Sequence, residues 1–131
     1  MDEYSYQPSE AYDGSQPPQM DLFTEQEFLR HRIDDFIEDY RKCGIEHAKA
    51  DREYHVVKAA KTLELRERGL PVTLIAEIVK GQVEVAEKRE QMLVSEVMTR
   101  AALEAVLSAK IQVKLVSQAL AREWANPQAS Y

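Results

Sequence analysis

The stretch Arg66-Glu67-Arg68-Gly69-Leu70-Pro71-Val72-Thr73 decides the fold, because it separates two long helical patterns. One pattern runs from about Thr24 to Arg68, and the other from about Thr73 to Ala125. Two arginines in a last turn, followed by glycine, are typical of a helix C-terminus, and the proline prevents continuation. At about 1.5 Å per residue each arm approaches ~60–70 Å. The sequence therefore predicts an all-α protein, a long antiparallel helical hairpin with a broken turn.

The first arm carries signals for its start. Thr24 and Glu27 have capping-box spacing, and Phe23 and Phe28 flank the cap as in a hydrophobic staple. We therefore expect the helix to begin at Thr24.

Apolar residues of the first arm recur with heptad spacing, which places them on one helix face. The two rows are Ile33, Tyr40, His47 and Tyr54, and Leu29, Phe36, Cys43, Ala50 and Val57. After Val57 the pattern slips, because Ala60 and Leu63 replace Lys61 and Glu64 as its apolar members. Such a slip indicates a change of winding or of packing partner.

The second arm is broader in its apolar character. Thr73 is a candidate N-cap, and Gly81 either ends this first piece or kinks it. Two apolar rows follow: Val83, Ala86, Leu93, Val97, Ala101, Leu107 and Ile111, and Val94, Met98, Ala102, Ala105, Ala109, Val113, Val116 and Leu120. This face is wider than a two-stranded seam needs, so we expect oligomerisation as a helical bundle or coiled coil, with the chain itself as a partner.

Composition bounds the class of protein. The 131 residues suit one domain, and the net charge of −6 disfavours general attraction to phosphate backbones. One cysteine, Cys43, excludes an intrachain disulfide, and neither a secretory signal nor a membrane-length apolar run is visible. We expect a cytoplasmic protein with a disordered acidic tail (1–21), a helical hairpin domain (22–127) and a C-terminal tail (128–131).

Signals for catalysis are weak. Asp35 with Glu38, and Glu84 with Glu87, have the i, i+3 spacing of the Mg²⁺ sites in all-α nucleoside triphosphate pyrophosphohydrolases, but the full doubled pattern is missing. The histidines have no metal-ligand spacing, and His47 in a heptad row more often sets register. The sequence predicts no enzyme, no catalytic residue, no metal site and no cofactor.

Binding residues are predicted at two places. The candidate partner contacts are Leu74, Ile75, Ile78 and Val79 after the turn, with Tyr4, Tyr6 and Tyr12 in the tail. The candidate anion or nucleic-acid contacts are Arg66, Arg68, Lys80, Lys88 and Arg89. The segment 65–81 also looks superficially like the opening of a helix-turn-helix, although the acid-rich residues 83–90 that follow do not suit a DNA-reading helix.

Half of the chain resembles a group of small helical proteins of bacteriophages and prophages. The similar residues are those from Leu63 to Ile75, then Val79-Lys80-Gly81, Val85-Ala86 and the terminal Arg122-Glu123-Trp124. Genes of that group tend to lie among early, replication or recombination functions, so the resemblance implies a phage origin more than an activity. We expect a phage-type accessory protein that binds a component of replication or recombination machinery, or a host defence system that it blocks. Two alternatives stay open, a nucleic-acid binder using the basic turn end and a nucleotide or small-ligand binder in the bundle core.

Overall fold

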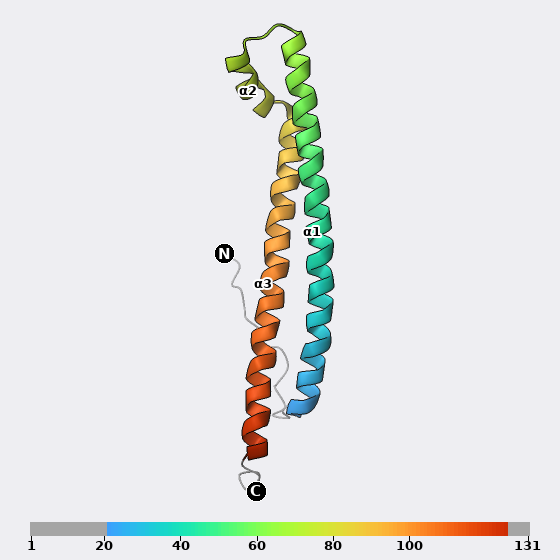
Figure 1. The fold of residues 1–131 in the computed structure, drawn as a ribbon, viewed down its shortest axis with the longest axis vertical. Helices are drawn as coiled ribbons and strands as arrows, with labels where there is room; N and C mark the ends of the chain where they lie inside the picture. The colour runs from blue at the N-terminus through green and yellow to red at the C-terminus, as the bar shows by residue number, and fades with distance from the viewer. Residues whose placement is uncertain (1–20, 126–131) are drawn as a thin grey trace, which may run out of the picture.

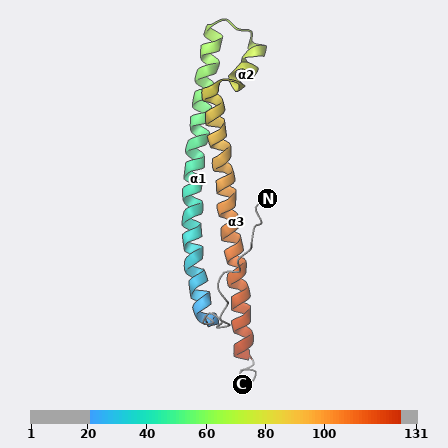
Figure 2. The ribbon, with the colours of Figure 1, turned by 180° about the vertical axis from the view of Figure 1, so that it is seen from behind.

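The computed structural model describes residues 21–125 as three helices in one hairpin (Figure 1). Helix α1 spans Leu22–Glu67, α2 spans Val72–Lys80 and α3 spans Val83–Ala125. The long helices α1 and α3 run antiparallel side by side, and α2 folds against their closed end (Figures 1 and 2). The predicted all-α hairpin with a broken turn is confirmed.

The ends of α1 follow from local chemistry. Asp21 is the N-cap, and its carboxylate accepts a hydrogen bond of 2.8 Å from the backbone N–H of Thr24. The predicted cap at Thr24 is therefore wrong, because a carboxylate three residues earlier already satisfies that donor. Phe23 and Phe28 are 64% and 54% exposed, so they form no buried staple. At the other end Gly69 adopts φ +79°, the left-handed conformation expected of a helix-terminating glycine.

Gly81 breaks the second arm. Its backbone N–H donates to the carbonyl of Ile78, and that of Gln82 donates to Val79, which closes α2 before α3 begins. The cap of α2 is Pro71 rather than the predicted Thr73, which lies inside the helix. Proline suits this place because a helix start leaves backbone N–H groups without partners in any case.

The seam between α1 and α3 has the heptad spacing of an antiparallel coiled coil. On α1 the two predicted rows face α3, with Leu29 buried, Tyr40 exposed at 37% and the other members half-buried. The α3 positions on the seam recur at intervals of three and four residues: Val85, Lys88, Met92, Ser95, Thr99, Ala102, Val106, Ala109, Val113, Val116 and Leu120. The buried residues of α3 include Val106, Ala109 and Val116. Small and β-branched residues here let two long helices pack with little interior.

One sequence prediction about the seam is wrong, and one predicted row of α3 lies outside the seam. The α1 rows do not slip, because Lys61 and Glu64 stay partly buried while Ala60 and Leu63 are exposed. Lys61 can face α3 because its ammonium group reaches the carboxylate of Glu84 at 3.4 Å. On α3, the predicted row from Val83 to Ile111 points away from α1.

Side-chain hydrogen bonds fix the register of the hairpin. Gln26 donates to the hydroxyl of Ser117 across 2.6 Å, and His47 Nδ1 lies 3.0 Å from the hydroxyl of Ser95. The Ser95 hydroxyl donates to the carbonyl of Met92, so its oxygen accepts from His47 Nδ1–H. These polar pairs lie far apart along the rod, and together they favour one alignment of α3 on α1.

Helix α2 caps the closed end of the hairpin. Its buried Ile75 and Val79 pack with Leu65 of α1 and Val85 of α3. This cluster holds the most deeply buried side chain of the described residues, Val79 at 2% exposure. Across residues 21–125, no helix combines the length and apolarity needed to cross a membrane.

Candidate partner-binding surfaces

The predicted partner contacts of α2 point in two directions. Ile75 and Val79 are buried in the core, and Ile78 is partly buried against it. Leu74 is 52% exposed, and the neighbouring Val72 is more exposed still. The surface that α2 presents is therefore narrower than the sequence predicted, because half of its apolar residues close the hairpin.

A groove of about 270 Å³ lies between α1 and α2, and we call it the α2 groove. One wall comes from α1, where Lys58, Thr62 and Arg66 succeed one another at helical spacing. Helix α2 supplies an apolar wall and one more cation; its lining residues are Val72, Ile75, Ala76, Val79 and Lys80. No carboxylate lines this groove, although the whole chain carries a net charge of −6.

The five predicted anion contacts do not form one cluster. Arg68 pairs with Glu64 at 2.8 Å, Lys80 with Glu77 at 3.2 Å, and Lys88 with Glu53 at 3.0 Å. Lys88 and Arg89 lie on α3, on the far side of the turn from α2. Only Arg66 and Lys80 of the five reach the α2 groove, where Lys58, which the sequence reasoning did not select, joins them.

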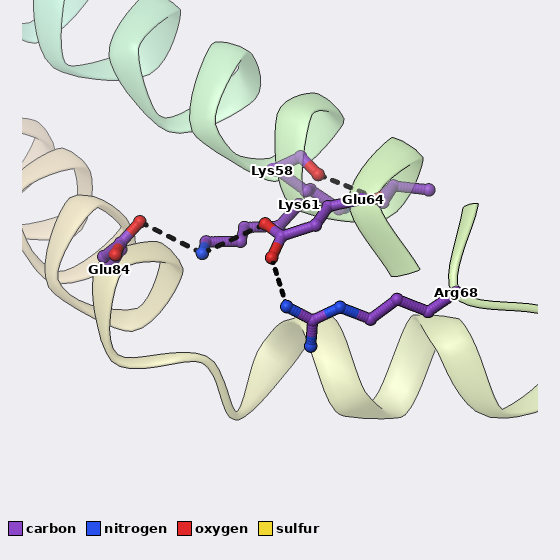
Figure 3. Close-up of polar contacts among 6 residues, drawn as sticks. Lys58, Lys61, Glu64, Arg68 and Glu84 are labelled. Atoms are coloured by element: carbon purple, nitrogen blue, oxygen red, sulfur yellow. Dashed lines mark hydrogen bonds and ion pairs between the residues drawn. The ribbon is translucent and has the colours of Figure 1, made fainter. Parts of the chain in front are cut away.

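Ion pairs beside the groove tie α1 to α3. Figure 3 shows Lys61 between Glu64 and Glu84, with Arg68 on the other oxygen of Glu64. Hydrogen bonding and attraction from Glu64, together with Glu84, raise the pKa of Lys61. Farther from the closed end of the hairpin, the hydrogen bond from Lys88 of α3 lowers the pKa of the Glu53 carboxyl of α1. These cations are engaged within the hairpin, so they are poor anchors for an outside ligand.

Helix α3 carries a second apolar surface beside its seam. Its members lie mostly three or four residues apart, with Val97 and Met98 adjacent, and we call them the α3 stripe: Val94, Val97, Met98, Ala101, Ala105, Ser108, Ile111 and Leu115. The large residues of the stripe are more than half exposed, with Leu115 at 57%. An apolar stripe at heptad spacing that no described residue covers is typical of a helix-docking surface.

A second groove, of about 590 Å³, joins the α3 stripe to α1. Its apolar lining comes from Cys43 on α1 and from Val94 and Met98 on α3. Its charged residues are three acids and one cation, so the rim is acidic on balance: Glu46, Glu87, Glu90 and Lys42. Such a rim repels phosphate groups, which disfavours this groove as a nucleotide site.

The acidic pairs weighed as a metal site lie apart along the rod. Glu84 sits beside Lys61, and Asp35 lies 26 residues earlier on α1, or roughly 40 Å along the helix axis. Among residues 21–125, no group of three or more His, Cys, Asp or Glu side chains is placed to hold a metal ion. The structure does not describe residues 1–20 and 126–131. The predicted contacts Tyr4, Tyr6 and Tyr12 and the two predicted tails, apart from Asp21, therefore lie outside the described residues.

Sequence reasoning missed the separation of the two faces of α3. The true seam includes Lys88, Ser95 and Thr99, whose polarity hides the heptad period. The α3 stripe is more apolar than the seam, so it was merged with it into one broad face. Leu115 was not selected, although its position seven residues after Ser108 was the available signal.

Comparisons with known proteins give no further assignment. No protein-family model matches the chain, and searches of curated proteins and of solved structures also return no match.

Proposed function

We propose that this protein is a non-enzymatic accessory factor that binds an acidic, amphipathic segment of another protein in the α2 groove. The observation that carries the proposal is the composition of that groove. Lys58 and Arg66, which form none of the ion pairs among the described residues, lie beside an apolar floor together with Lys80, which also pairs with Glu77. No acid lines the groove, although the chain carries a net charge of −6. A segment with carboxylates beside apolar side chains would satisfy both parts of this surface.

The class of partner rests on the resemblance to phage proteins. It suggests a component of replication or recombination machinery, or of a host defence system, met in the host cytoplasm. A regulator can control a protein of these classes by binding to it, without catalysing a reaction. A long helical hairpin suits such a role, because it presents a binding surface, the α2 groove, at one end.

A nucleic acid is the second candidate ligand, favoured by the same three cations. Phosphate contacts would make binding fall steeply with salt, by roughly one power of salt concentration for each contact. An amphipathic peptide would instead depend on both the cations and the apolar floor. The two readings therefore differ in how they respond to substitutions at Val72 and Ala76.

The test uses the full chain and a pair of charge reversals. Lys58→Glu with Arg66→Glu should abolish capture of the partner from the host, whereas Lys49→Glu with Arg52→Glu, which makes the same charge change elsewhere on α1, should not. A photo-reactive residue at Ala76 should cross-link to that same partner through an acidic segment, identified by mass spectrometry. Capture that survives the groove reversal would overturn the proposal.

Oligonucleotides provide the deciding comparison. Single-stranded and duplex DNA and RNA are passed over the immobilised protein at low salt. Retention that is lost in the Lys58→Glu and Arg66→Glu variant, but is unchanged by the uncharged substitution Val72→Ser, would replace the protein partner with a nucleic acid.

A further inference from the structure

The α3 stripe is a surface of a different kind from the α2 groove. None of its members is a lysine or an arginine. Its apolar residues extend over about six helical turns, from Val94 to Leu115. Burial of such a stripe at about 25 cal/mol per Å² favours association with another helix. The identity of that helix is encoded in the order of residues along the stripe.

One column of α3 recurs every seven residues and is complementary to itself when reversed. Read from its N-terminal end, the column is Glu87, Val94, Ala101, Ser108, Leu115 and Arg122. Acid and base occupy its two ends, large apolar residues come next, and small residues occupy its centre. None of the ion pairs among the described residues involves Glu87 or Arg122.

We propose that a second copy of this chain covers the α3 stripe, with the two α3 helices antiparallel and related by a twofold axis near Glu104 and Ala105. In this register Glu87 of each copy meets Arg122 of the other, and Val94 meets Leu115. Ala101 and Ser108 meet at the centre, where their small side chains allow the helix axes to approach closely. A twofold interface requires this reciprocity, since each contact occurs twice.

The neighbouring column supports the same register. That column is Val97, Glu104 and Ile111, so Val97 then lies against Ile111 of the other copy on both sides of the axis, and the two Glu104 carboxylates lie at the edge of the interface. The groove of about 590 Å³ at Cys43, Val94 and Met98 receives Leu115 of the second copy. Its acidic rim, which includes Glu87, receives Arg122. Each hairpin thus contributes α3 to the centre of a four-helix assembly.

The dimer leaves the α2 grooves free. Because the helices are antiparallel, the two α2 ends lie at opposite ends of the assembly. This inference is independent of the proposed function, which concerns the α2 groove and does not need a dimer.

The first test is mass measurement of the full chain by native mass spectrometry and sedimentation equilibrium. The wild type should be a dimer, and Leu115→Glu should weaken the dimer roughly tenfold or more, because it buries a charge in the apolar interface. Leu63→Glu is the matched control: Leu63 is 60% exposed on α1, close to the 57% of Leu115, and its substitution should leave the dimer intact. A monomeric wild type, or equal effects of the two variants, would overturn the inference. Circular dichroism is the folding control, and both variants should keep the helix content of the wild type.

Charge reversal tests the register. Glu87→Arg and Arg122→Glu should each weaken the dimer, and the double variant should restore it, because antiparallel pairing exchanges the two partners. Parallel pairing places each residue against its own copy, so the double variant would restore nothing.

Cysteine cross-linking gives an independent readout in a Cys43→Ala background. Ala105→Cys, next to the axis, should form an intermolecular disulfide under mild oxidation. Val94→Cys should not, since the proposed register separates its two copies by about 30 Å. The reverse result would mean that the helices pair in parallel, and would contradict the proposal.

Discussion

Gly69 shows how one backbone conformation sets the turn. Its φ of +79° is costly for any residue with a Cβ, although a Cβ added there would meet no atom within 4 Å. The effect of a substitution is therefore purely conformational. We expect Gly69→Ala to lower the free energy of unfolding by about 1 kcal/mol, measured by urea denaturation.

Gly44 provides the opposite case within the same chain. It lies inside α1, and an added Cβ also meets no atom within 4 Å, so the glycine allows no close helix approach in the hairpin. Gly44→Ala should raise the free energy of unfolding by about 1 kcal/mol through helix propensity alone. If both alanine variants changed stability in the same direction, the conformational explanation of Gly69 would be wrong.

Ser95 and His47 form a partly buried hydrogen bond across the seam, and removal of one partner leaves the other without this hydrogen bond. Ser95→Ala removes the acceptor of His47 Nδ1–H within the seam. We expect this variant to lose about 1 kcal/mol of stability, and His47→Leu with Ser95→Ala to recover it, because no polar group is then left without a partner. Thermal melts of the four proteins of this double-mutant cycle give the coupling.

At the scale of the helices, those polar pairs select one register. A slip of one heptad would bring His47 opposite Lys88 or Ala102, and Gln26 opposite Lys110 or Trp124. Both hydrogen bonds would be lost together. The doubly substituted hairpin should therefore be stable yet less uniquely aligned, and hydrogen exchange along α3 would detect the mixture of registers.

Helix α2 depends on very few side chains, because it has nine residues and isolated helices of that length are marginal. Val79→Ala should cost about 1.5–3 kcal/mol and release α2 from the hairpin while α1 and α3 stay paired. Limited proteolysis should then cut near Gly81. Val72→Ala, at an exposed position of the same helix, should leave the cleavage pattern of the wild type.

Helix type and extent were predictable here, and helix faces were predictable only in part. Arginines, glycine and proline between Arg66 and Pro71 locate the turn because each acts locally. The seam face of α3 was not predictable, because Lys88 and Ser95 are polar residues whose partners lie 35 or more positions away on α1. Likewise Lys61 reads as a break in the apolar row until Glu84 is seen beside it. Long-range ion pairs and hydrogen bonds leave no local trace in a sequence.

For the whole molecule, ion pairs between α1 and α3 make stability depend on pH. The pKa of Glu53 is lowered by Lys88, so its contribution is present above the usual carboxyl pKa of about 4.3 and is lost as pH falls through the lowered value. The pKa of Lys61 is raised by Glu64 and Glu84, so its contribution is present below about 10.4 and is lost as pH rises through the raised value.

These directions predict that two variants differ from the wild type in melting temperature over different pH ranges. The difference in melting temperature between the wild type and Glu53→Gln should be constant near neutrality and should shrink at acid pH. That between the wild type and Lys61→Met should shrink at alkaline pH. Melting curves across the pH range measure both, and a gap that stayed constant at either extreme would show that the corresponding pair contributes nothing.

The start of α1 and the end of α3 lie at the same end of the rod, and α2 closes the other (Figures 1 and 2). A pulling force applied to these two ends would break the contacts between α1 and α3 one after another, starting at the open end of the hairpin. Each heptad would yield at a low force, and Gln26 with Ser117 would part long before His47 with Ser95. A force applied between the closed end and the start of α1 would instead load the whole seam in parallel. The same hairpin is thus mechanically soft along one direction of pull and stiff along the other.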